Sequence, residues 1–204
     1  MLEFDVRKNQ NPEFIGFRWK KVPRIGKNRF EDEKIQFPTF EIDPEMGKSN
    51  SVEIRWKIIK NLQSEPDIGI GAAIRDEKGS ILGAVAKSVE GSFFLFLAEC
   101  LALREGLSFA KEIECVNLEV ETDAINVVST VVENRKLSME GPILEDVKQL
   151  LVQLRGTGIH HVCRSANLVA HLLARFGFNS NCTNVWISET PTVVSNAVSI
   201  DVIA

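Results

Sequence analysis

The sequence predicts an α/β fold in which one mixed sheet of five strands carries helices on its faces. Two apolar runs, residues 68–75 and 81–87, flank the polar stretch Asp76-Glu77-Lys78-Gly79, a pattern typical of a β-hairpin. Further along, strand-like runs alternate with segments whose apolar residues recur at helical spacing. Such crossovers return each new strand to the same sheet. The predicted order is three strands, a helix, a strand, two helices, a strand and a helix.

The first half of this order rests on three segments. Residues 52–62 alternate apolar and polar side chains and are the expected first strand. Residues 95–113 place apolar side chains three or four positions apart, which predicts a long helix. Residues 115–122 form the strand that follows, and it runs directly into Asp123.

The second half is defined by capping and stop signals. A short helix is expected over 124–133, capped by Thr122 or Asp123. Pro142 suits the first turn of a helix that reaches about Leu154. A last strand over 159–163 leads to a final helix over 165–176, which Ser165 is expected to cap and Gly177 to end.

The chain divides into an extension and a domain. Residues 1–50 are polar, contain four prolines and show no sustained period, so we expect them to be largely disordered and the domain to span 51–204. Residues 18–29 hold six basic residues and no acid. This stretch suits a nucleic-acid-binding arm or an import signal, but a solvated basic linker is the favoured interpretation.

Charge and cysteine usage narrow the function classes. Residues 1–65 carry 13 of the 24 Lys and Arg and 11 of the 28 Asp and Glu, which leaves 11 basic and 17 acidic residues and a formal charge of −6 beyond them. An acidic domain attracts a polyanion only through a local patch or a metal. The four cysteines form no CxxC pair, so they predict reduced thiols in an intracellular compartment, nuclear or cytoplasmic. No apolar run is long enough for a membrane span.

Five motifs in order resemble the ribonuclease H-like domains of plant reverse-transcriptase-related proteins (ribonuclease H type 1). They are GIGAAIRDEKG (69–79), LAECLALREGL (97–107), VETDAINVV (120–128), GPILEDVKQLL (141–151) and HVCRSANLVAHLLARFG (161–177). The resemblance covers roughly residues 66–202. It implies a ribonuclease H-like fold, a nucleic acid such as an RNA–DNA hybrid as partner, and hydrolysis of the RNA strand by two Mg²⁺ ions, with Mn²⁺ as a substitute. We expect a monomer without a small-molecule cofactor.

Active relatives use four acidic positions, and the resemblance maps three of them here. Glu99 matches the helix position, and its neighbours at 97, 98, 101 and 102 are apolar, so a charge there requires a partner or an ion. Asp123 matches the strand-end position; a helix N-cap for 124–133 is the alternative role, and the two roles are compatible. Both are therefore expected as catalytic residues and metal ligands; an ordinary surface glutamate is the alternative for Glu99.

The last helix supplies the remaining candidates. The fourth position falls at His171, where many active relatives carry Asp and plant members often carry His. His171 is either a catalytic residue or a partly buried core histidine. Arg164 and Asn167 resemble the rest of that motif and are expected as substrate-binding residues, Arg164 through a phosphate; a bond to backbone is the alternative for Asn167.

The first acidic position has no match. The family carries Asp-Gly after its first strand, whereas this chain has KIIKNLQSEPDIGIG, in which Asp67 reads as a turn residue. Two hypotheses follow. The chain is either a metal-dependent hybrid ribonuclease impaired by the missing acid, or a catalytically inactive nucleic-acid-binding or interaction module derived from a degenerate retroelement.

Overall fold

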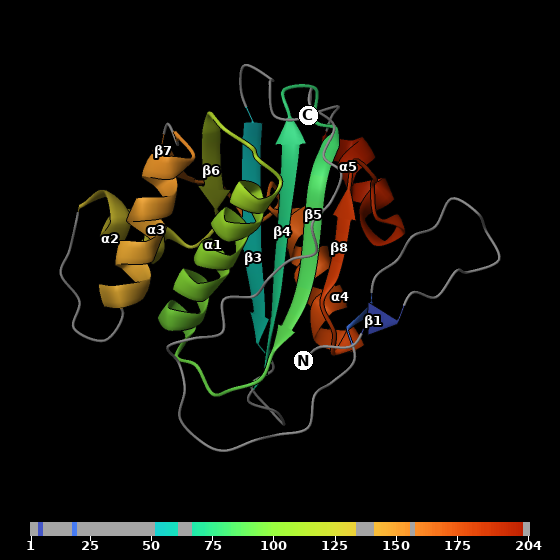
Figure 1. Ribbon diagram of the computed structural model, residues 1–204, viewed down its shortest axis with the longest axis horizontal. Coiled ribbons are helices and arrows are strands. Elements are labelled where there is room, and N and C mark those ends of the chain that lie inside the picture. Colours follow the sequence, from blue (N-terminus) through green and yellow to red (C-terminus); the bar gives the residue numbers. More distant parts are fainter. Residues whose placement is uncertain are drawn as a thin grey trace.

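The computed structural model describes residues 4–5, 18–19, 52–60, 67–133, 141–155 and 158–201. In these residues a six-stranded sheet has the order β7-β6-β3-β4-β5-β8 (Figure 1). Its strands are β3 (Val52–Lys60), β4 (Ile68–Asp76), β5 (Ile81–Val89), β6 (Leu118–Thr122), β7 (Gly158–His161) and β8 (Asn184–Ile187). β6 pairs parallel with β3 and β7, and the other pairs are antiparallel. The predicted mixed α/β sheet is confirmed, with six strands instead of five.

The helices cover both faces of the sheet. They are α1 (Leu95–Glu112), α2 (Ile125–Val132), α3 (Gly141–Gln153), α4 (Leu168–Ser180) and α5 (Ser195–Asp201), with a 3-10 turn, η1 (Thr192–Val194), before α5. In Figure 1, α1 and α3 lie in front of the sheet and α4 lies behind it. None of the described helices has the length and apolar character that a membrane span requires.

Little of the extension belongs to the described residues. β1 (Phe4–Asp5) and β2 (Arg18–Trp19) pair antiparallel in a two-residue ladder. The expected disorder of residues 1–50 and most of the basic stretch 18–29 lie outside the described part of the chain. The domain boundary at residue 51 stays a prediction.

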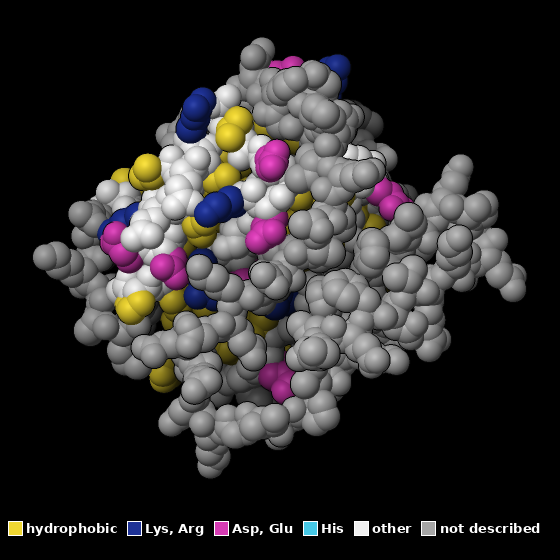
Figure 2. Space-filling model, in the orientation of Figure 1, with side chains coloured by type: hydrophobic (Ala, Val, Ile, Leu, Met, Phe, Trp, Pro, Cys, Tyr) yellow, Lys and Arg dark blue, Asp and Glu magenta, His cyan; other side chains and the backbone are white. Residues whose placement is uncertain are grey.

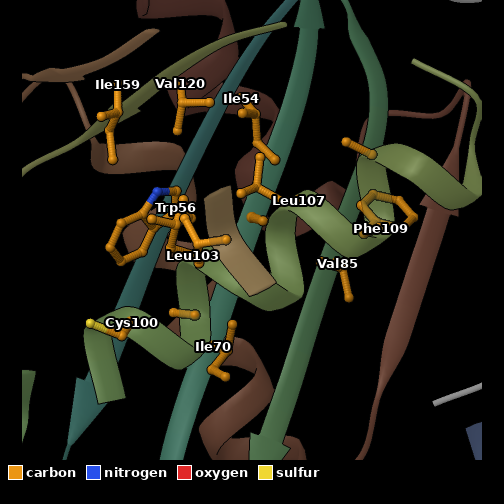
Figure 3. Close-up of a cluster of buried hydrophobic side chains, with 14 of the residues drawn as sticks. Ile54, Trp56, Ile70, Val85, Cys100, Leu103, Leu107, Phe109, Val120 and Ile159 are labelled. Atoms are coloured by element: carbon orange, nitrogen blue, oxygen red, sulfur yellow. The ribbon is translucent and has the colours of Figure 1, made fainter. Parts of the chain in front are cut away.

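Strand β3 is the centre of the fold because it joins the local hairpins to the later β6. From residue 52 to residue 58, its even-numbered side chains are buried and face α1, and its odd-numbered side chains are half-buried on the α4 side. Figure 3 shows the α1 side, where Trp56 and Ile54 of β3 meet Leu103 and Leu107 of α1. Burying these large apolar side chains is the main source of stability, at about 1.5–3 kcal/mol each.

The α4 side of the sheet is packed through backbone contact. A Cβ added at Gly69 or Gly71 of β4 would come within 3.0 Å of backbone atoms of α4. A Cβ at Gly177 would meet the backbone of Lys87 in β5 equally closely. Gly177 was predicted to end this helix, but it lies inside α4. The C-cap of α4 is Asn181, which has a left-handed φ of 48°. Close packing on the sheet explains the glycine better than a stop signal does.

The sixth strand, β8, was missed by the sequence prediction. It has only four residues, too few to show a period, and it pairs antiparallel with β5 from Gly83↔Ile187 to Ala86↔Asn184. Its Trp186 ring meets the Phe176 ring of α4 edge-on, with centroids 5.8 Å apart. β8 thus forms one edge of the sheet, beside β5.

Candidate nucleic-acid interface and carboxylate site

The candidate site lies where the parallel strands β3 and β6 end. Their register pairs Arg55 with Glu121, so two residues further on Lys57 lies level with Asp123. Side chains two positions apart share a face, and these therefore both point to the α4 side. The fold thus places a lysine beside the strand-end aspartate.

Asp123 is held by hydrogen bonds to both of its carboxylate oxygens. The Lys57 ammonium donates to Oδ2, and the Asn167 amide donates to Oδ1 over 2.7 Å. The Arg164 Nε lies 3.9 Å from Oδ2. The Asp123 side chain is only 9 % exposed and that of Lys57 only 12 %. Neither Asp123 nor Thr122 caps α2, although one of them was expected to: the N-cap is Ala124, without a side-chain cap hydrogen bond, and the Thr122 hydroxyl accepts from the Ala124 N–H just before the helix.

These contacts determine the charge of Asp123. Burial alone would raise the pKa of its carboxyl, but the hydrogen bonds from Lys57 and Asn167 and the charge of Lys57 outweigh burial. The pKa of Asp123 therefore lies below its ordinary value of 3.8. Asp123 is a carboxylate throughout the physiological pH range.

Asn167 joins the start of α4 to the sheet. It is 1 % exposed, and its amide also donates to the Trp56 carbonyl over 3.0 Å. Arg55 adds a second link, since its guanidinium donates to the Ala166 carbonyl at 2.5 Å and to Glu121 at 2.7 Å. Asn167 thus bonds to backbone, one of the two roles expected for it, and it positions Asp123; its contact with a substrate stays a prediction.

Glu99 reaches the same site from the start of α1. It is half-buried, and both Lys57 and Asp123 act on it electrostatically. Burial raises the pKa of its carboxyl above 4.5, Lys57 opposes this rise and Asp123 adds to it. The helix that carries Glu99, α1, lies over β3 and β4, next to the strand that runs into Asp123.

Neutralising Glu99 is expected to stabilise the protein. Because the pKa of Glu99 is raised on folding, its ionised form costs stability above that pKa, and the cost vanishes as the pH falls below 4.5. Glu99→Gln should therefore melt at a higher temperature than wild type at pH 7 and at the same temperature at pH 4. Thermal melts across this range measure it, with the exposed Glu145→Gln as control. A lower melting temperature for Glu99→Gln at pH 7 would contradict the assignment.

His171 lies one turn into α4, close enough for Lys57, Arg164 and Asp123 to act on it electrostatically. Burial and the nearby cations lower its pKa below 6.5, which favours the neutral imidazole. Its Nδ1 is buried without a hydrogen-bond partner among the described residues. The structure thus brings Glu99, Asp123, Arg164 and His171 together, as the sequence predicted.

The described donor set does not fit a two-metal centre. No group of three His, Cys, Asp or Glu side chains that could hold a metal occurs in the part of the chain that the structure describes. Asp67, which precedes β4, accepts a hydrogen bond from the Gly91 N–H at 3.3 Å. Lys57 pairs with Gly71 of β4, and Asp67 lies four residues before Gly71. Asp67 is therefore roughly 13 Å along the strand from the level of Lys57. Asp67 therefore does not replace the missing acid.

Lys57 is the site residue that sequence reasoning missed. The first strand was predicted over this segment, and its alternation already placed residue 57 opposite the apolar face. The sequence did not show that this strand pairs in parallel with the 115–122 strand, and only that pairing sets Lys57 beside Asp123. The family pattern predicts an acid in this segment, whereas the chain carries a base.

A mixed sheet with a carboxylate-bearing edge between α1 and α4 is the arrangement of a ribonuclease H-like domain. The reverse transcriptase-like family matches residues 60–177, and this chain belongs to that family. The match begins three residues after Lys57, in agreement with the weaker resemblance of this region. A search of curated proteins gives no match.

Three of the solved structures with a similar fold are ribonuclease H domains. The N-terminal ribonuclease H domain of a Mycobacterium tuberculosis protein shares 20 % identity and a TM-score of 0.57, covering 64 % of this chain and 95 % of its own. Ribonuclease H1 of the archaeon Halobacterium salinarum shares 18 % identity with a TM-score of 0.58, and the match covers 64 % of this chain and 98 % of that one. LC11 ribonuclease H1 was isolated from compost by a metagenomic approach and solved with an RNA/DNA hybrid. It shares 18 % identity with a TM-score of 0.57, and the match covers 63 % of this chain and 97 % of that one. At these identities the likeness shows the fold.

Proposed function

We propose that this domain binds RNA–DNA hybrids and has lost most or all Mg²⁺-dependent hydrolysis of the RNA strand. Membership of the family supports nucleic-acid binding and hybrid hydrolysis as the family's activities. One observation carries the proposed loss of hydrolysis. Where β3 runs level with Asp123, the chain presents the ammonium of Lys57 instead of a carboxylate.

Phosphodiester hydrolysis by two metals requires several carboxylates that hold both ions about 3.5–4 Å apart. Among the described residues only Glu99 and Asp123 converge at this edge, and both oxygens of Asp123 already accept hydrogen bonds. His171 adds a nitrogen donor, which suits Mg²⁺ poorly. Residual cleavage should therefore be weak and should favour Mn²⁺, which tolerates a wider range of ligands.

Arg164 is the residue best placed to contact a phosphate. Its side chain is 80 % exposed beside the buried Asp123, so its guanidinium is available to a ligand. A planar guanidinium pairs with phosphate through two parallel hydrogen bonds. On the face seen in Figure 2, which is opposite to α4, the described basic and acidic side chains are interspersed and gather into no basic patch. The α4 side is therefore the proposed binding face.

The proposal is tested by measuring binding and cleavage with the same labelled hybrid. Wild type should bind in EDTA, and binding should weaken with salt. Arg164→Ala should weaken it further and lower the slope of log K against log salt by about one phosphate contact. The exposed Arg155→Ala, on the loop after α3, is a matched control that should change neither.

Cleavage of the RNA strand is expected to be absent or very weak in Mg²⁺ and at most slightly stronger in Mn²⁺. Gel-resolved products measure it, with Asp123→Asn as the comparison. Robust Mg²⁺-dependent turnover that Asp123→Asn abolishes would overturn the loss of function and identify the domain as an active nuclease. Failure of wild type to bind any hybrid would instead favour an interaction module without a nucleic-acid ligand.

The proposal also includes the remaining expectations from sequence. The domain acts as a monomer without a small-molecule cofactor, in the nucleus or the cytoplasm. Light scattering of the purified chain tests the first of these, and imaging of the tagged chain tests its location.

A further inference from the structure

Lys57 places a positive charge beside Asp123, at a position where a carboxylate would bind metal. The parallel register of β3 and β6 places Lys57 beside Asp123. A shift of this register by one residue is excluded, because it would move the Trp56 side chain out of the core. The ammonium therefore reaches the carboxylate from the strand next to it. Neighbouring strands lie about 4.8 Å apart, close enough for a direct contact between the two side chains.

The site is neutralised by its own side chains. Glu99 and Asp123 supply two negative charges, and Lys57 and Arg164 supply two positive charges. At 12 % and 9 % exposure, Lys57 and Asp123 are partly withdrawn from water, so each requires the other. A divalent cation that approached Asp123 would meet the ammonium at contact distance and would be repelled by it.

We propose that the Lys57 ammonium takes the place of a divalent cation between Glu99 and Asp123, so that the folded domain needs no metal at this site and binds one there only weakly. This inference deepens the proposed function, since it concerns the same site. It also predicts that the metal site is latent. One substitution that exchanges the ammonium for a carboxylate recreates a cluster of three acids around the position that the ammonium vacates.

The experiment measures Mn²⁺ binding, because Mn²⁺ accepts oxygen ligands and its spin resonance signal reports the bound fraction directly. Wild type, Lys57→Asp and Lys57→Asp/Asp123→Asn are titrated with Mn²⁺, and their melting temperatures are recorded in EDTA and in Mn²⁺. Lys57→Asp should bind one Mn²⁺ at least roughly tenfold more tightly than wild type, and Mn²⁺ should raise its melting temperature. The double variant should lose both effects.

Three mutually repelling carboxylates will weaken Lys57→Asp in EDTA, so its fold is followed by circular dichroism. Refolding on addition of Mn²⁺ supports the proposal. If Lys57→Asp stays unfolded, Lys57→Met decides, because it removes the ammonium and adds no acid. Tighter Mn²⁺ binding by Lys57→Met than by wild type supports the proposal, and equal binding overturns it.

Two further results overturn the inference. One is Mn²⁺ binding by wild type that Asp123→Asn abolishes and that is as tight as binding by Lys57→Asp. The other is a folded Lys57→Asp that binds no Mn²⁺. Hybrid binding by wild type in EDTA is measured separately. Its absence would remove the proposed function and leave these metal titrations valid.

Discussion

Gly71→Val is expected to lower the free energy of unfolding by about 3 kcal/mol or more, the upper end of what overpacking a well-packed core costs. The reason is steric. A Cβ at position 71 would come within 3.0 Å of backbone atoms of Ala170 and Ala174, and of the Leu173 Cβ at 2.8 Å. Backbone atoms cannot rotate away as side chains do, so α4 would have to move off the sheet. Urea unfolding of both proteins measures the difference.

The matched control is Gly141→Ala at the start of α3. A Cβ there meets nothing within 4 Å, so the change adds no clash. It should leave stability unchanged or raise it by a few tenths to about 1 kcal/mol through helix propensity. A Gly71→Val protein as stable as Gly141→Ala would show that α4 does not pack on β4 as described.

Asp123→Ala is expected to lower stability by about 3–5 kcal/mol, because it leaves the Lys57 ammonium partly buried without its counter-ion. The double variant Lys57→Met/Asp123→Ala should recover part of this loss, because no uncompensated charge remains. Urea unfolding of the two single variants and the double variant forms a double-mutant cycle that isolates the coupling between the two side chains.

The control for the cycle is the exposed pair His160 and Glu119, whose closest atoms are 3.6 Å apart and whose side chains are about half exposed. Exposed pairs contribute little, so Glu119→Ala should change stability by less than about 1 kcal/mol. Coupling between Lys57 and Asp123 no larger than that of this surface pair would refute the buried contact.

The local patterns of the sequence predicted most of the elements. The hairpin between β4 and β5 forms as expected, with Gly79 at a positive φ of 79° and the Asp76 carboxylate accepting from the N–H groups of Lys78 and Ser80. Glu99 was rightly expected to lie among apolar neighbours and near Asp123. These patterns reflect short-range preferences, and the contacts between neighbouring elements in the fold are consistent with them.

What could not be predicted depends on contacts between distant elements. Ser165 looked like a helix cap, yet α4 begins at Leu168, because Asn167 and Arg55 fix the chain before it to β3. The partnership of Lys57 with Asp123 joins residues 66 positions apart, and only the register of a parallel pair defines it. No local pattern reports such a register.

The short strand β8 has a consequence for solubility. Without it, the whole outer side of the nine-residue strand β5 would present unpaired N–H and C=O groups, to which a second chain could add a strand. β8 pairs with four central residues of β5, and the Ser188 N–H extends the cover to the Leu82 carbonyl. The opposite edge is formed by β7, which has only four residues. Both margins of the sheet are thus short, a property that protects natural β-proteins from aggregation.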